Sequence, residues 1–145
     1  MWRLTWRTFG TAEVVKLTVG EVWRIYVPYN DGPFPPGSDT GKWRPGVVIG
    51  WSPEVVSSQQ PLGAQPVVLV VPITSFGDGG QPRDGDVPVA DYQAAGLTKP
   101  SWIRARVLFS AHPKAFRGGT GPLGRVSRHE LRAIFAEISA LVAPN

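Results

Sequence analysis

Stretches of alternating apolar and polar residues recur along the chain, and this two-residue period is typical of β-strands with one buried face. Segments rich in Gly, Pro and polar residues separate these stretches and predict turns and loops. The predicted strands span residues 20–29, 44–51, 66–75, 86–90, 100–109 and 123–126. The third of them is a continuous apolar run, so we expect it to be buried on both faces.

The end of the chain follows a helical period instead. Ser127 precedes Glu130 by three residues, which is the spacing of a capping box at the start of a helix. The apolar residues that follow fall on one stripe of that helix: Leu131, Ile134, Phe135, Ile138, Leu141 and Val142. We expect this stripe to pack on the sheet as core, and Pro144 to mark the end of the helix.

The order of these elements indicates the fold class. Several strands follow one another with no helix between them, and one helix comes last. This order argues against a doubly wound parallel sheet and predicts a mainly β fold with a C-terminal α-helix, built as a small antiparallel β-barrel. We expect the domain to span residues 20–145, after an N-terminal arm or extra strand at residues 1–19. Loops are predicted at residues 30–43, 52–65 and 76–85.

Composition narrows the chemistry. The chain has no Cys, which excludes a disulfide framework and any zinc site that needs thiolates. The two His residues, His112 and His129, are not spaced as metal ligands, so we expect no metal or other cofactor. The net charge of +4 and the pI of about 9.9 permit an anionic partner without requiring one. No apolar segment has the length of a signal peptide or a membrane span, which predicts a cytoplasmic protein without a membrane partner.

Five short segments occur in a particular order: GEVWRIYVPY followed by NDG, then KWRPGVVIGW, VVPITS, PSWIRARVLF and LGRVSRHEL. Each alone is weakly specific, but their order and spacing, from about residue 20 to residue 142, resemble the MazF/PemK family of toxins. The resemblance implies an SH3-like β-barrel with a C-terminal helix that acts as a homodimer. It also implies the toxin of a type II toxin–antitoxin pair, inhibited by an antitoxin protein.

The resemblance further implies a reaction and two catalytic residues. The implied reaction is metal-independent cleavage of single-stranded RNA, with mRNA as the expected class, by attack of a 2′-hydroxyl on the adjacent phosphate. The family's catalytic arginine and threonine match Arg44 and Thr74. A guanidinium has forked donors suited to phosphate oxygens but is an awkward base, so we favour charge stabilisation by Arg44 over acid–base catalysis. Thr74 follows a buried run and is expected to hydrogen-bond the scissile phosphate, with Ser75 beside it in a supporting role.

Candidate RNA-binding residues surround these two positions in the sequence. Lys42, Trp43 and Phe34 belong to the predicted loop at residues 30–43, where bases can stack on rings while cations follow the phosphates. A surface loop with one buried aromatic anchor explains the same residues. Trp43 stands where the family commonly has a basic residue, and Gly46 where a branched or small residue is more usual.

The predicted strand at residues 100–109 supplies the last candidates. Its alternation puts Arg104 and Arg106 on an outward face together with Trp102, where they can line the RNA groove, line a dimer interface or be merely solvated. The opposite face is expected to point into the core. That face consists of Ile103, Ala105, Val107 and Phe109.

Other functions share this barrel. One alternative is a gyrase-poisoning inhibitor of the CcdB type, which acts through C-terminal aromatic residues, but the tail LVAPN has no Trp. Another is a non-catalytic barrel that only binds nucleic acid, and the presence of both Arg44 and Thr74 weighs against it. For an antitoxin, the basic charge predicts an acidic, flexible segment that competes with RNA for one groove.

Overall fold

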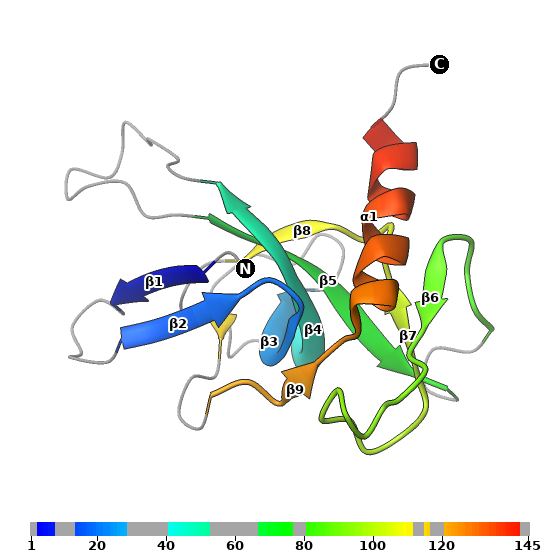
Figure 1. Cartoon of the computed structure of the whole chain (residues 1–145), viewed down its shortest axis with the longest axis horizontal. Helices are drawn as coiled ribbons and strands as arrows, with labels where there is room; N and C mark the ends of the chain where they lie inside the picture. The colour runs from blue at the N-terminus through cyan, green and yellow to red at the C-terminus, as the bar shows by residue number, and fades with distance from the viewer. Residues whose placement is uncertain are drawn as a thin grey trace.

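The computed structural model in Figure 1 describes residues 3–7, 14–28, 41–52, 67–76, 81–111, 115–116 and 121–142. The strands are β1 (Arg3–Arg7), β2 (Val14–Thr18), β3 (Glu21–Pro28), β4 (Gly41–Ser52), β5 (Val67–Ser75), β6 (Asp86–Pro88), β7 (Ser101–Arg104), β8 (Phe109–Ala111) and β9 (Gly124–Arg125). The helix is α1 (Arg128–Val142). Within the described residues, no helix is long and apolar enough to cross a membrane.

A sheet of seven antiparallel strands forms the body of the molecule, in the order β6-β7-β5-β4-β3-β9, with β8 also paired to β5. The sheet curls into a half-barrel, and α1 stands beside it (Figure 1). The predicted class, mainly β with a C-terminal helix and an antiparallel barrel-like sheet, is confirmed.

The N-terminal residues form strands of their own. β1 pairs antiparallel with β2, with Leu4 opposite Leu17, and together they make a separate two-stranded sheet. Leu17 is fully buried in a cluster that includes Trp23, Ile25 and Val48. The second strand of this pair is thereby tied to the core of the larger sheet.

β5 lies at the centre of the core. Val68 and Val70 belong to one buried cluster, whereas Val71 and Ile73 belong to the other. Because neighbouring residues of a strand point to opposite faces, this division confirms that the apolar run is buried on both faces.

Gly46 permits a close approach within this core. A Cβ at this position would lie 2.9 Å from Ile25 Cδ1 and 3.2 Å from the carbonyl oxygen of Val71. The absence of a side chain lets Ile25 of β3 fill this space between strands. The departure from the family pattern at Gly46 therefore has a packing reason.

The prediction of one strand at residues 100–109 is wrong. β7 ends at Arg104, a turn follows, and β8 begins at Phe109. Both short strands pair with β5, with Ile103 opposite Ile73 and Phe109 opposite Val70. Ile103 and Phe109 are six residues apart, but their partners in β5, Ile73 and Val70, are only three apart. The additional residues between β7 and β8 therefore lie outside the ladder. Val107, expected in the core, is consequently exposed.

The capping box of α1 is confirmed. The Ser127 amide donates to Glu130 Oε1 at 2.8 Å, and the Glu130 amide donates to Ser127 Oγ at 3.1 Å. The second carboxylate oxygen, Glu130 Oε2, accepts a hydrogen bond from the amide of Ala90 at 2.7 Å. Glu130 thus starts the helix and also fixes it to the segment that follows β6.

The apolar stripe of α1 is only partly buried, which corrects the expectation that all of it is core. Ile134 is fully buried, and Leu131 and Ile138 pack against the core. The other members of the stripe are exposed: Phe135, Leu141 and Val142. The reason is geometric, because the C-terminal half of α1 extends past the edge of the sheet (Figure 1).

Candidate active site

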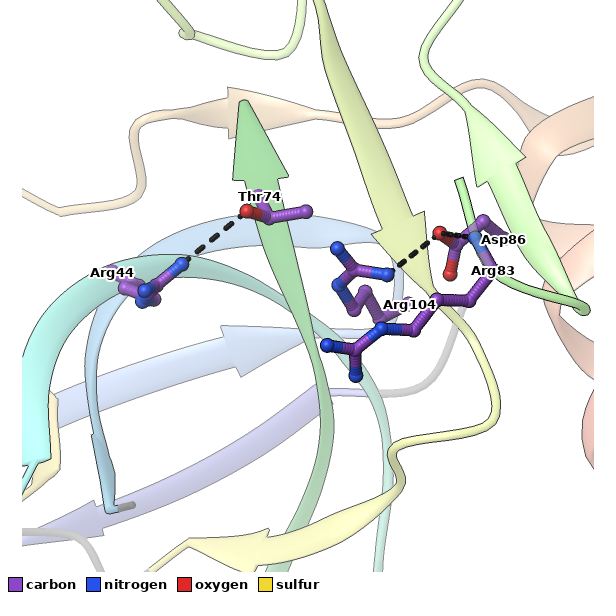
Figure 2. Close-up of polar contacts among 5 residues, drawn as sticks. All are labelled: Arg44, Thr74, Arg83, Asp86 and Arg104. Carbon is purple, nitrogen blue, oxygen red and sulfur yellow. Dashed lines mark hydrogen bonds and ion pairs between the residues drawn. The ribbon is translucent and has the colours of Figure 1, made fainter. Parts of the chain in front are cut away.

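The two predicted catalytic residues meet across β4 and β5. Arg44 Nη1 donates a hydrogen bond to Thr74 Oγ1 at 3.3 Å (Figure 2). The register places Gly46 opposite Pro72, and the same register continued by two residues brings Arg44 to Thr74. Thr74 is 5% exposed, and Arg44 is partly buried. Sheet pairing therefore joins two side chains that are 30 residues apart in sequence.

Arg44 lies inside a strand rather than at its start. Residues 41–43, predicted as the end of a loop, belong to β4, which begins at Gly41; the rest of the predicted loop lies outside the described residues. Lys42 pairs with Val27 and Trp43 with Tyr26, so both residues continue the ladder between β3 and β4. The Trp43 and Tyr26 rings make an edge contact with centroids 5.7 Å apart. A rigid ladder, not a loop, thus holds this part of the site.

Five predicted site residues converge on one pocket of about 440 Å³. They are Lys42, Trp43, Arg44, Thr74 and Ser75. The contact between Arg44 and Thr74 is part of the wall of this pocket. Phe34, predicted as an RNA-binding residue, lies outside the described residues.

The pocket also contains cations that sequence reasoning missed. Arg24 of β3 and Lys99 line it together with Lys42 and Arg44. Among the described residues that line the pocket there is no carboxylate. Arg24 could have been identified from the sequence, because it is a charged residue in an otherwise apolar stretch, and the structure shows it exposed between buried neighbours in β3. Lys99 gave no such signal, because its segment follows no periodic pattern.

A turn brings Lys99 to the pocket. Asp91 Oδ1 accepts a hydrogen bond from the Ala94 amide at 3.1 Å, and the turn ends at Gly96 with a positive φ of 79°. A Cβ on Gly96 would collide with the backbone of Leu123, so only glycine allows this approach. The turn leads directly into Thr98 and Lys99 at the rim of the pocket.

Arg104 and Arg106 do not line this pocket, and the predicted exposure of Arg104 is wrong. Its guanidinium is buried and forms an ion pair with Asp86 at 2.8 Å, with side chains 9% and 4% exposed (Figure 2). Asp86 lies opposite Arg104 in the β6–β7 register and also accepts the Arg83 amide. Arg106 is exposed and pairs with Glu137 of α1 at 3.0 Å. Both arginines thus form ion pairs with other parts of the chain.

Metal ligands do not gather in the described part of the chain. No group of three or more His, Asp or Glu side chains there lies close enough together to hold a metal ion. The described lining of the candidate site consists of cationic, hydroxyl-bearing, aromatic and aliphatic residues.

A family model described as the PemK-like, MazF-like toxin of type II toxin–antitoxin systems matches residues 19–142. The chain belongs to the PemK/MazF toxin family. Its half-barrel with a C-terminal helix agrees with the fold of that family. A PemK/MazF toxin of a type II system implies a protein antitoxin as partner. A search of curated proteins finds no matching relative.

Proposed function

We propose that this PemK/MazF-family toxin is a metal-independent endoribonuclease that cuts single-stranded RNA, with Arg44 and Thr74 as its catalytic residues. The observation that carries the proposal is the 3.3 Å contact between Arg44 and Thr74 inside a pocket that holds four cationic side chains and, among its described lining, no carboxylate. Such a pocket favours a polyanion over a neutral ligand.

The reaction requires a balanced exchange at one phosphorus atom. The 2′-oxygen forms a bond to phosphorus and loses its proton, while the bond to the 5′-oxygen breaks and that oxygen gains a proton. The products are a 2′,3′-cyclic phosphate and a 5′-hydroxyl. Negative charge grows on the phosphoryl oxygens in the transition state, and preorganised donors that match this charge lower the barrier.

Arg44 and Thr74 are suited to provide these donors. The guanidinium of Arg44 offers several N–H donors, and only one of them is used in the hydrogen bond to Thr74 Oγ1. Because Oγ1 accepts that bond, the hydroxyl hydrogen of Thr74 is available to donate to a phosphate oxygen. Thr74 is held by a buried strand, so this donor needs little reorganisation on binding.

The substrate is single-stranded RNA, with mRNA in the cytoplasm as the expected class. Arg24, Lys42 and Lys99 are placed to contact phosphates on either side of the cleaved bond. The indole of Trp43 also lines the pocket and offers an apolar surface to an unpaired base. An unpaired strand exposes its bases to such contacts, whereas a duplex does not.

The antitoxin is expected to use the same pocket. An acidic, flexible segment would meet the four cations there and exclude RNA. Competition binding tests this point. A protein that binds antitoxin and RNA at the same time, without loss of affinity for either, would contradict it.

A homodimer is expected to form through the exposed apolar side chains of α1. Phe135, Leu141 and Val142 leave apolar surface uncovered on one element, and burial of such surface drives association.

The proposed activity is tested by incubating the purified toxin with a long single-stranded RNA in excess EDTA. Arg44→Ala and Thr74→Ala variants are treated in parallel, and Arg106→Ala serves as the matched arginine control because Arg106 lies outside the pocket and pairs with Glu137. We expect discrete fragments with cyclic-phosphate ends from the wild type and from Arg106→Ala only.

Two results would contradict the proposal. One is the absence of cleavage on several RNAs of diverse sequence by wild-type protein with an intact circular dichroism spectrum. The other is full cleavage by Arg44→Ala and Thr74→Ala. The first result would favour a non-catalytic toxin, and gyrase inhibition would then be assayed.

A further inference from the structure

Two aromatic rings stack at the end of the strand that carries Thr74. Phe76 follows directly after β5, and its ring lies on that of Trp102 with centroids 4.2 Å apart and an angle of 29° between the planes. The Phe76 amide donates to the carbonyl oxygen of Pro100 at 3.0 Å, which fixes the backbone at this point. Phe76 is nevertheless 46% exposed, so much of this residue is accessible to a ligand.

The stacked rings lie on the same side of the sheet as Thr74. Trp102 of β7 is directly opposite Thr74 in the register with β5, and residues directly opposite each other point to the same face. Phe76 is two residues beyond Thr74, which returns it to that face as well. The polar pair of Arg44 and Thr74 and the ring pair of Phe76 and Trp102 are therefore neighbours on one surface.

The pocket beside these rings indicates what would cover them. Thr74, which lies opposite Trp102 and two residues before Phe76, lines the same pocket as Arg44 and Lys99, whereas Phe76 and Trp102 are outside that lining. An exposed aromatic ring next to a cationic pocket suits a ligand that has both phosphates and flat bases.

We propose that Phe76, held by stacking on Trp102, is a platform for one RNA base next to the cleaved phosphodiester. The proposal rests on the endoribonuclease function and assigns the substrate contact that helps to set sequence preference. While the phosphate binds at Arg44 and Thr74, the neighbouring base stacks on the open part of the Phe76 ring. Because a larger ring system overlaps more with Phe76, a purine is favoured over a pyrimidine at this position.

The experiment starts from the mapped cleavage site of the wild-type toxin. A short fluorescent RNA containing that site carries a 2′-deoxynucleotide at the cleaved position, which removes the nucleophile and permits equilibrium binding. In further versions of this RNA, a single nucleotide on one side or the other of the cleavage site lacks its base. Their dissociation constants are measured for the wild type and for the variants Phe76→Ala, Phe76→Leu and Phe76→Tyr.

We expect Phe76→Ala and Phe76→Leu to weaken binding between about 5-fold and about 150-fold, and Phe76→Tyr to bind like the wild type. Removal of one particular base next to the cut should weaken wild-type binding by a similar factor but should have no further effect in Phe76→Ala. At saturating RNA the cleavage rate of Phe76→Ala should stay within a few-fold of the wild type, since the platform contributes to binding and not to the chemical step.

Failure of this proposal differs from failure of the endoribonuclease function. If the wild type cleaves RNA but removal of each base weakens binding to Phe76→Ala as much as to the wild type, the platform is refuted while the activity stands. If RNA affinity is unchanged in Phe76→Ala but self-association or antitoxin binding is reduced, the rings belong to a protein interface and the platform is again refuted. Absence of wild-type cleavage refutes both, because no base then lies next to a cut.

Discussion

Arg44 Nη1 and Thr74 Oγ1 form a 3.3 Å hydrogen bond across the β4–β5 ladder, although the residues are 30 positions apart in sequence. Thr74 is at the same time the partner of Trp102 in the pairing of β5 with β7. One short stretch of β5 therefore aligns a cation on one side with an aromatic ring on the other.

Replacement of Arg44 by Lys should show whether the forked guanidinium matters beyond its charge. Lys keeps the positive charge but not the planar donors, so cleavage should fall about 10²-fold, and with Arg44→Ala about 10³-fold. Single-turnover cleavage of one RNA, with folding checked by circular dichroism, measures both. Equal rates for Arg44→Lys and the wild type would mean that a point charge is sufficient.

Replacement of Thr74 by Val removes the hydroxyl and keeps the shape of the side chain. Cleavage should fall about 10²-fold, because the phosphate loses a donor and Arg44 loses the acceptor that orients it. Thr74→Ser keeps the hydroxyl and should retain most of the activity. If Thr74→Val is as active as Thr74→Ser, the hydroxyl has no part in the reaction.

Arg104 and Arg106 should differ strongly in their contribution to stability. Arg104→Ala leaves the buried Asp86 carboxylate without its ion-pair partner and should lower the free energy of unfolding by about 3–5 kcal/mol. Arg106→Ala breaks a pair whose side chains are 42% and 33% exposed, so the loss should be below about 1 kcal/mol. Urea denaturation measures both. Similar losses for the two variants would contradict the assignment of Arg104 to the interior.

Gly46→Ala should destabilise the fold by about 1–3 kcal/mol, because the added methyl group would press on Ile25 and on the backbone of Val71. Gly50→Ala is the matched control, since a Cβ there has no atom within 4 Å. The double variant Gly46→Ala with Ile25→Val should recover part of the loss. Thermal unfolding compares the three, and equal midpoints for Gly46→Ala and Gly50→Ala would oppose the packing explanation.

Leu141→Glu should convert the expected homodimer to a monomer without unfolding it. Leu141 is exposed on the apolar stripe of α1, so a charge there costs little in the monomer but is costly in an apolar interface. Ala140→Glu adds the same charge at an exposed position on the opposite face of the helix and should leave the dimer intact. Analytical ultracentrifugation distinguishes the two states. A monomeric wild type, or a dimer that survives Leu141→Glu, would place the interface elsewhere.

Local patterns in the sequence predicted local structure well. The capping box of Ser127 and Glu130 involves residues three apart, so the sequence contains both partners. The continuous apolar run at β5 required burial on both faces wherever the strand was placed. Both predictions are confirmed, because the physics that decides them acts within one element.

Alternation failed where pairing with a distant strand decided the outcome. The period of two would continue through Arg104 to Phe109 only if β7 and β8 kept one register with β5, and the register shifts between them. Arg104 is buried because Asp86, its cross-strand partner, supplies the counter-charge. Both residues are present in the sequence, but no local pattern indicates that they lie opposite each other on neighbouring strands.

The sequence by itself determined the fold class, the start of the helix and the membership of Arg44 and Thr74 in a family pattern. Only the tertiary structure decided that these two side chains touch, that Arg24 and Lys99 join their pocket, and that half of the α1 stripe stays uncovered. The physical reason is the range of the forces involved. Caps and periodic burial are fixed within a few residues, whereas a pocket depends on which strands pair and in which register.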